Sequence, residues 1–335
     1  MHQTDSNDTP QNQARRLIET ARLAPSVHNV QPWYFRLHGN ILQLHVSNER
    51  LLHAGDPTTR ELWLSIGIMF ETIIQTAAAL GIAIKITDVQ THSLTDPIAL
   101  IAILPNRQTA SKATLAIMQN RHTHRGALSE KPVASHILKS INSIKTNGLK
   151  GVDVLATDDK TIIKLASKLT QQGLTLAFSS TAFRHELSHL IHPNWTRART
   201  GLPGFVLQKG IVGSLWEKWS LRFNLDNVRK AKTEARRVQQ APLLIFIATR
   251  GDVPAHWFNA GRAYTLLTHN LTRNNLLHST VAAPIEAADL HEELEAALHT
   301  KLRLQCMLLA GYAQSKEQKK AKSPRLTVDE LLLID

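Results

Sequence analysis

Prolines and small polar side chains gather in a short stretch near the start of the chain. Residues 24–33 read Ala-Pro-Ser-Val-His-Asn-Val-Gln-Pro-Trp, and the two prolines restrict the backbone path to that of a loop. Ser26, Asn29 and Gln31 can each donate and accept hydrogen bonds, which suits a planar, heteroatom-rich ligand better than a metal. The same residue types make ordinary turns, so these residues alone leave a plain loop open.

A second cluster is basic. Residues 120–125 read Asn-Arg-His-Thr-His-Arg, so Arg121 and Arg125 lie four residues apart with His122 and Thr123 between them. Two guanidinium groups with further donors between them can converge on one phosphate dianion through charge-assisted hydrogen bonds. A helix end that is simply rich in basic residues is the alternative interpretation.

Both clusters resemble one family. The pattern Pro-Ser-x-x-Asn-x-Gln-Pro-Trp resembles the flavin-contacting loop of the nitroreductase family of FMN-dependent oxidoreductases. The basic cluster is similar to that family's Arg-x-Ser-x-Arg element, which holds the FMN phosphate, with Thr123 in the serine position. The closer resemblance is to the double-length, Acg-like branch, in which one chain resembles two fused nitroreductase halves.

The resemblance implies a set of residues around a non-covalent FMN. Residues 323–331 are similar to the family's closing segment, whose basic residue also reaches the phosphate. Residues 279–286 match the segment that lays a backbone amide near flavin N5, but alanines replace its glycines, and a positive φ would be costly for alanine. The implied cofactor-binding residues are Pro25, Ser26, Asn29, Gln31, Arg121, His122, Thr123, Arg125, Ala283, Pro284 and Arg325.

The implied fold is α+β and nitroreductase-like, with two fused halves that form a pseudo-dimer, each with a mixed sheet flanked by helices. We expect a first half at 14–110 with the loop, and a second at 111–335 with the phosphate clamp. Residues 178–238 have no counterpart in the first half, and their glycines and proline suit a hinged lid. A surface excursion is the alternative. Because loop and clamp each occur once, we expect one FMN between the halves.

Hydrophobic periodicity predicts the elements that must position these clusters. Asp56 is expected to cap a helix that begins at Pro57, and Gly81 to end it. Gly67 and Gly261 sit at similar places in two long helices, which indicates a weak internal repeat. The predicted helices are 14–24, 57–80, 113–119, 134–145 and 257–277, and the predicted strands are 34–37, 41–46, 83–89, 98–104, 152–156, 243–248 and 302–309.

Composition bounds the remaining possibilities. With 335 residues and 43% hydrophobic content, a large core is expected. The single cysteine, Cys306, excludes an intramolecular disulfide and lies in an apolar run, where a buried thiol is expected. Residues 1–10 are polar and no apolar run spans a membrane, so we expect a cytoplasmic protein without a membrane partner.

The charge of +12 is concentrated in three basic stretches, at 184–199, 222–237 and 316–325. These stretches lack the interleaved aromatic residues of a single-strand binding groove and any recognisable DNA-binding motif. We therefore expect solvated helix faces rather than a nucleic-acid partner.

The sequence leaves three functions open. The resemblance implies an oxidoreductase in which NAD(P)H reduces FMN, and FMN reduces an acceptor such as a nitro compound or quinone, with no side chain required as acid or base. A flavin-sequestering store is the alternative, and the chain is expected as a monomeric pseudo-dimer or a homodimer. Residues 185–189 also match the His-Glu-x-x-His zinc motif, which still requires a third ligand and is the least favoured interpretation.

Overall fold

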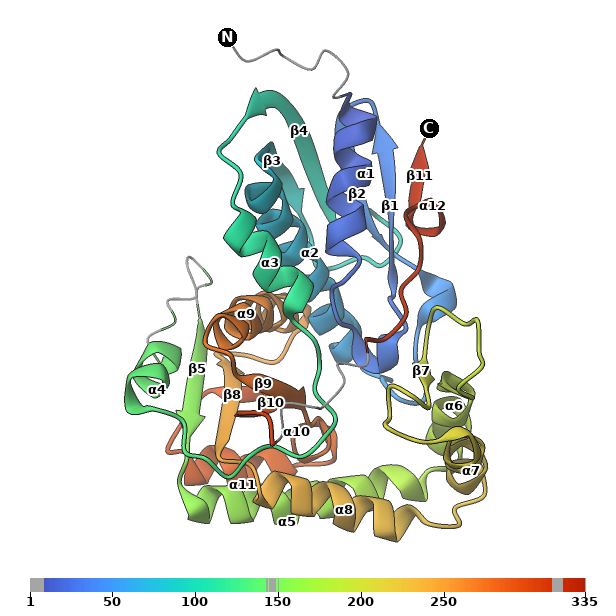
Figure 1. Cartoon of the computed structure of the whole chain (residues 1–335), viewed down its shortest axis with the longest axis vertical. Helices are drawn as coiled ribbons and strands as arrows, with labels where there is room; N and C mark the ends of the chain where they lie inside the picture. Colours follow the sequence, from blue (N-terminus) through green and yellow to red (C-terminus); the bar gives the residue numbers. More distant parts are fainter. Residues whose placement is uncertain (1–8, 143, 145–148, 150, 315–321, 335) are drawn as a thin grey trace.

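The computed structural model describes residues 9–142, 144, 149, 151–314 and 322–334 of an α+β protein. Two β-sheets lie at opposite ends of the molecule, and the long helices α2 and α9 cross between them (Figure 1). Apolar residues of both sheets and of both helices belong to one continuous core, so the two ends are packed together through these helices.

The two sheets share one topology. The first sheet has the strand order β11-β1-β2-β4-β3, and the second has the order β5-β8-β10-β9. If β11 is set aside and the four strands of each sheet are numbered along the chain, both sheets have the spatial order 1-2-4-3. In both, neighbours among these four strands are antiparallel and a long helix joins the second strand to the third. This repetition supports an internal duplication. The strands are β1 Trp33–His38, β2 Ile41–Val46, β3 Ile82–Val89, β4 Ala99–Arg107, β5 Val152–Thr157, β6 Ile191–His192, β7 Leu202–Pro203, β8 Leu243–Thr249, β9 Leu277–Thr280, β10 Arg303–Gly311 and β11 Leu332–Ile334.

The first sheet is mixed, because β11 joins β1 in parallel. The named strands of the second sheet are antiparallel to one another, and a parallel bridge joins Thr123 to His278 of β9 at its edge. The last residues of the helix predicted at 134–145 lie outside the described residues. The helices are α1 Pro10–Ala21, α2 Arg60–Leu80, α3 Lys112–Asn120, α4 Ser135–Asn142, α5 Lys160–Ser179, α6 Thr181–Leu190, α7 Ile211–Arg222, α8 Asn227–Gln239, α9 Pro254–Arg273, α10 Ala283–Glu286, α11 Leu290–Ala297 and α12 Val328–Leu331, with 3₁₀ turns at Val27–Asn29 and Asn48–Arg50.

Helices α2 and α9 touch backbone to backbone at two glycines. A Cβ atom on Gly67 would lie 1.9 Å from the Phe258 carbonyl oxygen, and one on Gly261 would lie 2.0 Å from the Leu64 carbonyl oxygen. Each glycine therefore packs on the residue three positions before the other glycine, as a two-fold relation between the helices requires. The paired glycines noted in the sequence meet at this crossing.

The start of α2 differs from the prediction. The helix begins at Arg60 rather than Pro57, because Thr59 is left-handed, with φ of 62°. Asp56 still caps it, since its carboxylate accepts from the amides of Glu61 at 3.1 Å and Leu62 at 2.7 Å. The predicted stop is confirmed, because Gly81 follows the last turn with φ of 68°. By length and composition α2 could cross a membrane, but 83% of its most apolar window is buried in the core.

The segment 178–238 divides into two parts. Helices α6 and α7, with the short strands β6 and β7, project along one side of the molecule, whereas α8 runs beside α5 beneath the second sheet (Figure 1). A small separate apolar cluster, formed by Phe178, Ile191 and Leu221, holds the projecting part together. We refer to residues 180–225 as the lid segment.

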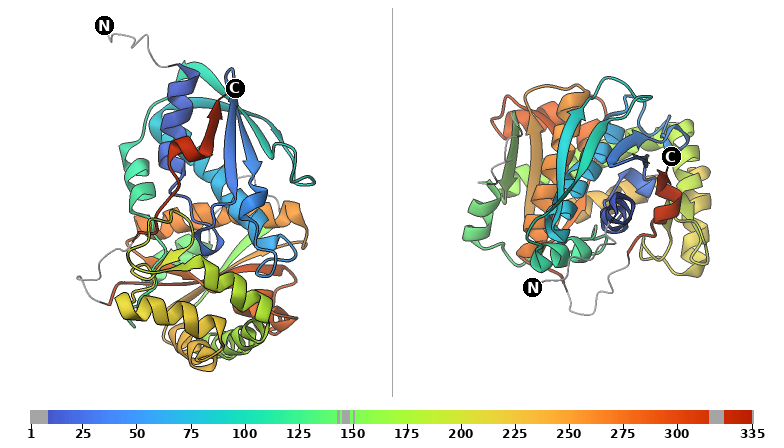
Figure 2. Two further views of the ribbon diagram at one scale, coloured as in Figure 1. Left: turned by 90° about the vertical axis from the view of Figure 1, so that its right-hand side faces the viewer. Right: turned by 90° about the horizontal axis from the view of Figure 1, so that it is seen from above.

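The C-terminal segment returns to the first half. Strand β11 lies beside β1, with Leu332 opposite Phe35 (Figure 2). Leu331 and Leu332 are buried, whereas Leu333 is exposed. The basic residues 316–321 lie outside the described residues.

Candidate functional site

The loop at residues 24–33 is a strained bend. His28, Asn29 and Gln31 have φ values of 43°, 60° and 52°, a left-handed conformation that costs side-chain-bearing residues about 1–3 kcal/mol each. Contacts within the loop support it in part, because the Ser26 hydroxyl accepts from the Gln31 amide at 2.9 Å and the Ser26 carbonyl oxygen accepts from the Asn29 amide at 3.1 Å. Contacts with distant segments add to this support, which makes the loop more than an ordinary turn.

Asn29 joins the loop to two distant segments. Its Nδ2 group donates to the carbonyl oxygens of Gly201 in the lid segment and Pro324 near the C-terminus, both at 3.0 Å. Its Oδ1 atom accepts from Nη1 of Arg325 at 2.6 Å. The side chain predicted to border the flavin therefore positions the lid segment and Arg325 in this structure.

Gln31 makes a matching set of contacts. Its Nε2 group donates to the Arg199 carbonyl oxygen at 2.8 Å, and its Oε1 atom accepts from the Leu326 amide at 3.0 Å. The side chain is fully buried. Both amide side chains of the loop are thus engaged by backbone groups of the lid segment and the C-terminal segment.

Arg121 lies behind the loop and is buried. With Leu23, Pro25 and His269 it lines a cavity of about 10 Å³, room for roughly one water molecule. Its Nη2 atom lies 3.5 Å from the Leu23 carbonyl oxygen, and within the described part of the chain its Nη1 atom has no partner. Burial lowers the pKa of Arg121 from its usual value.

Arg125 and Arg325 lie near Arg121 and are affected by the same two factors, burial and neighbouring positive charge. Burial and the nearby Arg237 lower the pKa of Arg125 to about 10. Burial, followed by the charges of Arg121 and Arg125, lowers the pKa of Arg325 to about 9. The segments predicted to hold a phosphate, at 121–125 and at 325, therefore lie close enough for their guanidinium groups to repel one another.

No acid neutralises these arginines in the described part of the chain. Arg121, Arg125 and Arg325 form no ion pair there, and the group that favours the charge of Arg121 is Tyr264, which burial keeps neutral by raising its pKa. A buried charge without a partner is costly, so this arrangement calls for an anion. A phosphate would satisfy the free Nη1 of Arg121 and the partnerless Nε of Arg325.

His122 and Thr123 are held by the second sheet. Thr123 forms a parallel bridge with His278, and the His124 amide donates to the His278 carbonyl oxygen at 2.8 Å. His122 contacts the Asn120 carbonyl oxygen through Nδ1 at 3.0 Å. The basic cluster is therefore a fixed edge next to β9 rather than a loose helix end.

Ala283 and Pro284 open helix α10, which packs on α5. A Cβ atom on Gly173 would lie 2.4 Å from the Ala283 carbonyl oxygen, so the two elements touch closely. Ala282, which precedes the helix, has φ of −86°. The expected strain of a positive φ at these alanines is therefore absent.

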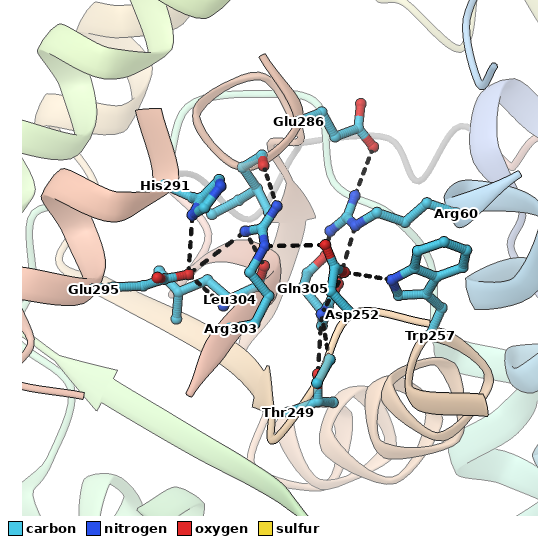
Figure 3. A network of polar contacts seen from close by, with 12 residues as sticks. Arg60, Thr249, Asp252, Trp257, Glu286, His291, Glu295, Arg303, Leu304 and Gln305 are labelled. Carbon is cyan, nitrogen blue, oxygen red and sulfur yellow. Dashed lines mark hydrogen bonds and ion pairs between the residues drawn. The ribbon is translucent and has the colours of Figure 1, made fainter. Parts of the chain in front are cut away.

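A pair of carboxyl groups at the start of α2 was missed by the sequence analysis. Nη1 of Arg60 lies 3.1 Å from Glu286 of α10 (Figure 3). The same atom lies 3.2 Å from Glu61, so one guanidinium contacts both carboxyl groups. Burial, and then the charge of Glu286, raise the pKa of Glu61 well above its usual value. Arg60 and Glu61 are adjacent in the sequence, but nothing in the sequence relates them to Glu286, which only the fold brings to the start of α2.

A polar network fixes Arg60 from behind. Its Nε atom donates to Oε1 of Gln305 at 3.0 Å, and the Gln305 amide group donates to Asp252 at 3.0 Å (Figure 3). Asp252 also accepts from the Trp257 indole at 2.6 Å. The first turns of α2 and α9 are thereby tied together. Cys306, beside this network on β10, is buried as predicted.

The lid segment is latched to the first half. Glu186 accepts from the amides of Ala54 at 3.2 Å and Gly55 at 2.7 Å. Its neighbours His185 and His189 approach each other, with Nε2 atoms 3.4 Å apart. Among the described residues no group of three or more His, Cys, Asp or Glu is placed to hold a metal ion, so the zinc interpretation lacks its third ligand.

His28 is the point where these features meet. Burial lowers its pKa, and the charges that act on it belong to Glu61 of the carboxyl pair, Arg125 of the basic cluster and Glu186 of the lid segment. The loop therefore lies close to the basic cluster, the carboxyl pair and the lid segment, and Asn29 links it to Arg325. His28 lies within the predicted loop, but its residue type alone did not predict this position.

Comparison with known proteins gives similarity in sequence and in fold. No family model matches the chain. The protein "Putative NAD(P)H nitroreductase acg" of Mycobacterium tuberculosis is 23% identical over 328 residues, which cover 94% of this chain and 93% of that protein. A second protein of that organism, "Putative NAD(P)H nitroreductase Rv3131", is 32% identical over 122 residues, 36% of this chain and 35% of that protein.

Among solved structures, the FMN and NADPH-dependent nitroreductase NfnB from sphigopyxis sp. strain HMH overlaps 64% of this chain and 96% of its own, with a TM-score of 0.42 and 17% identity. The similarity to the Acg protein, in contrast, runs through both sheets and the lid segment. Over nearly its whole length the chain is therefore similar to a double-length protein that is named as an NAD(P)H nitroreductase, in agreement with the Acg-like resemblance of its sequence.

Proposed function

We propose that the protein binds one FMN between its two halves and acts as an NAD(P)H-dependent oxidoreductase. The observation that carries the proposal is a group of three arginines, one buried and two half-buried, that no acid neutralises within the described residues. Such a group fits the phosphate dianion of FMN. The names of the relatives support nicotinamide as the reductant. A nitro compound or a quinone is the proposed acceptor.

In this proposal Arg121, Arg125 and Arg325 hold the phosphate, with His122 and Thr123 as further donors. Pro25 and Ser26 border the flavin from the loop, and Ala283 and Pro284 approach it from the second half through their backbone. Asn29 and Gln31 act one step away, because their side chains position Arg325 and the lid segment. FMN supplies the hydride chemistry when it is bound, and the protein supplies binding, orientation and exclusion of water.

We further propose that the halves are 14–110 and 111–335, with residues 178–238 inserted in the second. The shared strand order of the two sheets and the reciprocal glycine contact support this division. One chain then supplies both sides of one flavin site, so a monomeric pseudo-dimer is sufficient.

Anaerobic stopped-flow mixing of the FMN-loaded protein with NADPH, and separately with NADH, tests the reductase function. Rapid loss of the yellow flavin absorbance, followed by its return when a nitroaromatic or a quinone is added, is the expected result. Flavin that stays oxidised with either nicotinamide at saturating concentration contradicts a reductase.

A flavin store is the second candidate, and the latched lid segment favours it. Glu186, Arg199 and Gly201 all bind backbone or side-chain groups of residues 29–55, which supports a lid that covers the proposed site. A lid that stays closed would keep nicotinamide out while retaining FMN. In the same stopped-flow experiment, a store predicts persistent absorbance in the wild type and bleaching only when the latch is broken by Glu186→Ala.

A further inference from the structure

Helix α7 of the lid segment presents its apolar face to solvent. At 3.6 residues per turn, Ile211, Val212, Leu215 and Trp219 fall on one side of the helix, and Phe223, directly after its last residue, continues that side. Val212 is 79% exposed, Trp219 54% and Phe223 55%. The opposite side, which faces the protein, carries Ser214, Ser220 and Leu221, all of them buried, and Leu221 is the one apolar side chain that the described part of this helix buries.

This orientation is the reverse of that of an ordinary surface helix, whose apolar stripe faces the core. The exposed apolar side chains continue beyond the helix to Leu225 and Val228, and Phe205 lies before it. The tryptophans divide in the same way: Trp33, Trp63 and Trp257 are buried elsewhere, whereas the exposed ones are Trp195, Trp216 and Trp219 of the lid segment. A concentration of exposed apolar residues of this kind marks a contact surface.

The charges around this surface are basic. Lys218 and Arg222 lie along one edge of the apolar side and have no acidic partner among the described residues, and His189 of α6 is close to both. The acids of this region are already paired, because Glu217 binds Lys209 and Lys230, and Asp226 binds Arg229. The surface therefore offers apolar anchors edged by free cations.

We propose that the outer face of α7, formed by residues 211–223, docks on an anionic lipid surface. Tryptophan and phenylalanine beside lysine and arginine on one helix are the composition of a helix that lies in the membrane interface. A second copy of this chain fits less well, because a two-fold contact through this face would bring Lys218 and Arg222 of both copies together. Helix α7 itself lies at one side of the molecule, away from the two large sheets (Figure 1).

Flotation of the full-length protein with vesicles tests the proposal, using phosphatidylcholine alone and phosphatidylcholine mixed with phosphatidylglycerol. Binding to the anionic vesicles at low salt, a blue shift of tryptophan emission and weaker binding at high salt are expected. Trp219→Ser combined with Phe223→Ser should weaken binding at least 10-fold. Lys218→Gln combined with Arg222→Gln should weaken it roughly 10- to 30-fold and flatten the salt dependence.

Val253→Ser is the matched control, since Val253 is exposed but lies outside the lid segment, and it should bind as the wild type does. Circular dichroism confirms that each variant is folded, and the readout requires no cofactor. Equal binding of all variants overturns the proposal, as does no binding to anionic vesicles. A concentration-dependent dimer that the Trp219 and Phe223 substitutions dissolve also overturns it in favour of self-association.

Discussion

Without a bound anion, Arg121, Arg125 and Arg325 lower the stability of the folded protein. Arg121 is buried, and Arg125 and Arg325 are half-buried. Burial lowers the pKa of each, and neighbouring guanidinium groups lower the pKa of Arg125 and of Arg325 further. The two clusters at 25–31 and 121–125 could be found from the sequence because residue type and spacing carry their chemistry. The need for an anionic partner could not be predicted from the sequence, because only the folded chain shows that no acid lies near these arginines.

Replacing Arg121 by Met should separate the cost of its buried charge to the apoprotein from its contribution to FMN binding. The apoprotein is expected to gain about 1–2 kcal/mol of stability, because an unpaired buried charge is removed, while the stabilisation by added FMN is lost. Thermal unfolding with and without FMN measures both. Lys112→Met, an exposed change on α3, should leave both within about 0.5 kcal/mol. An R121M apoprotein that is less stable than wild type would contradict the buried-charge interpretation.

Two capping aspartates should respond to pH in opposite directions. Burial raises the pKa of Asp56 to about 6, so the native state holds this proton more tightly than the unfolded state, and stability should fall as pH rises from about 4 to about 6. Asp159 is fully exposed, and hydrogen bonds from the amides of Thr161 and Ile162 lower its pKa, so its contribution is present at neutral pH and is lost on acidification.

Denaturant unfolding across this pH range, with Asp56→Asn and Asp159→Asn, measures the contrast. The side-chain amide introduced by D56N retains one acceptor oxygen for the Leu62 amide, and this variant should gain up to roughly 2 kcal/mol at neutral pH relative to wild type. D159N should lose stability at neutral pH and match the wild type in acid. A D56N protein clearly less stable than wild type at neutral pH would show that the helix dipole outweighs burial.

The regular elements could largely be predicted from local patterns. Strand β2 occurs as predicted at 41–46, and α2 ends at the predicted glycine, because alternation and a left-handed cap are local signals. The start of α2 was misplaced because its cap, Asp56, acts across a left-handed Thr59. The elements of the lid segment could not be predicted, since α7 turns its apolar side outward and a sequence pattern does not say which side faces the core.

The crossing of α2 and α9 gives a sharp test of the core. Gly67→Ala or Gly261→Ala would place a methyl group within about 2 Å of a backbone oxygen, and helix backbones cannot yield cheaply. We expect a loss of roughly 3 kcal/mol or more, or failure to fold. Gly213→Ala is the control, because a Cβ atom there meets nothing closer than 3.5 Å, and it should be neutral or stabilising by about 0.5–1 kcal/mol. Equal effects at the three glycines would contradict the close crossing.

The latch of the lid segment can be weakened by degrees. Glu186→Ala removes the acceptor for both Ala54 and Gly55 amides, whereas Glu186→Gln retains one acceptor oxygen. FMN release, followed by fluorescence, should accelerate about 10-fold or more for E186A and less for E186Q, because a charge-assisted hydrogen bond contributes about 1.5–3 kcal/mol. Release at the wild-type rate in both variants would show that the lid segment does not retain the flavin.

At the scale of the whole molecule, the C-terminal segment joins the second half back to the first. The C-terminal segment leaves the second half, passes Asn29 and Gln31, and adds β11 to the first sheet. The duplication could be inferred only weakly from the sequence, through two glycines, because topology rather than residue identity is repeated. No local sequence pattern determines the order of the strands in a sheet, so this order could be seen only in the structure.

Truncation after residue 322 should therefore do more than remove Arg325. It deletes β11 and the Leu326 amide that binds Gln31, so the first sheet is expected to lose several kcal/mol together with FMN. Arg325→Met should lose FMN affinity while the fold stays intact. Unfolding curves and FMN content of the two variants distinguish these outcomes, and a truncated chain as stable as R325M would contradict a structural role for the segment.

The central claim is that the loop and the three arginines surround the phosphate of one flavin, and calorimetric titration of the apoprotein with FMN and with riboflavin tests it most directly. Riboflavin has the same ring system but lacks the phosphate. The predicted result is one FMN per chain, riboflavin bound at least 100-fold more weakly, and near-equal affinities in the R121M/R125M variant, since two charge-assisted contacts contribute about 3–6 kcal/mol. Equal wild-type affinities for the two flavins, or two FMN molecules per chain, would contradict the account.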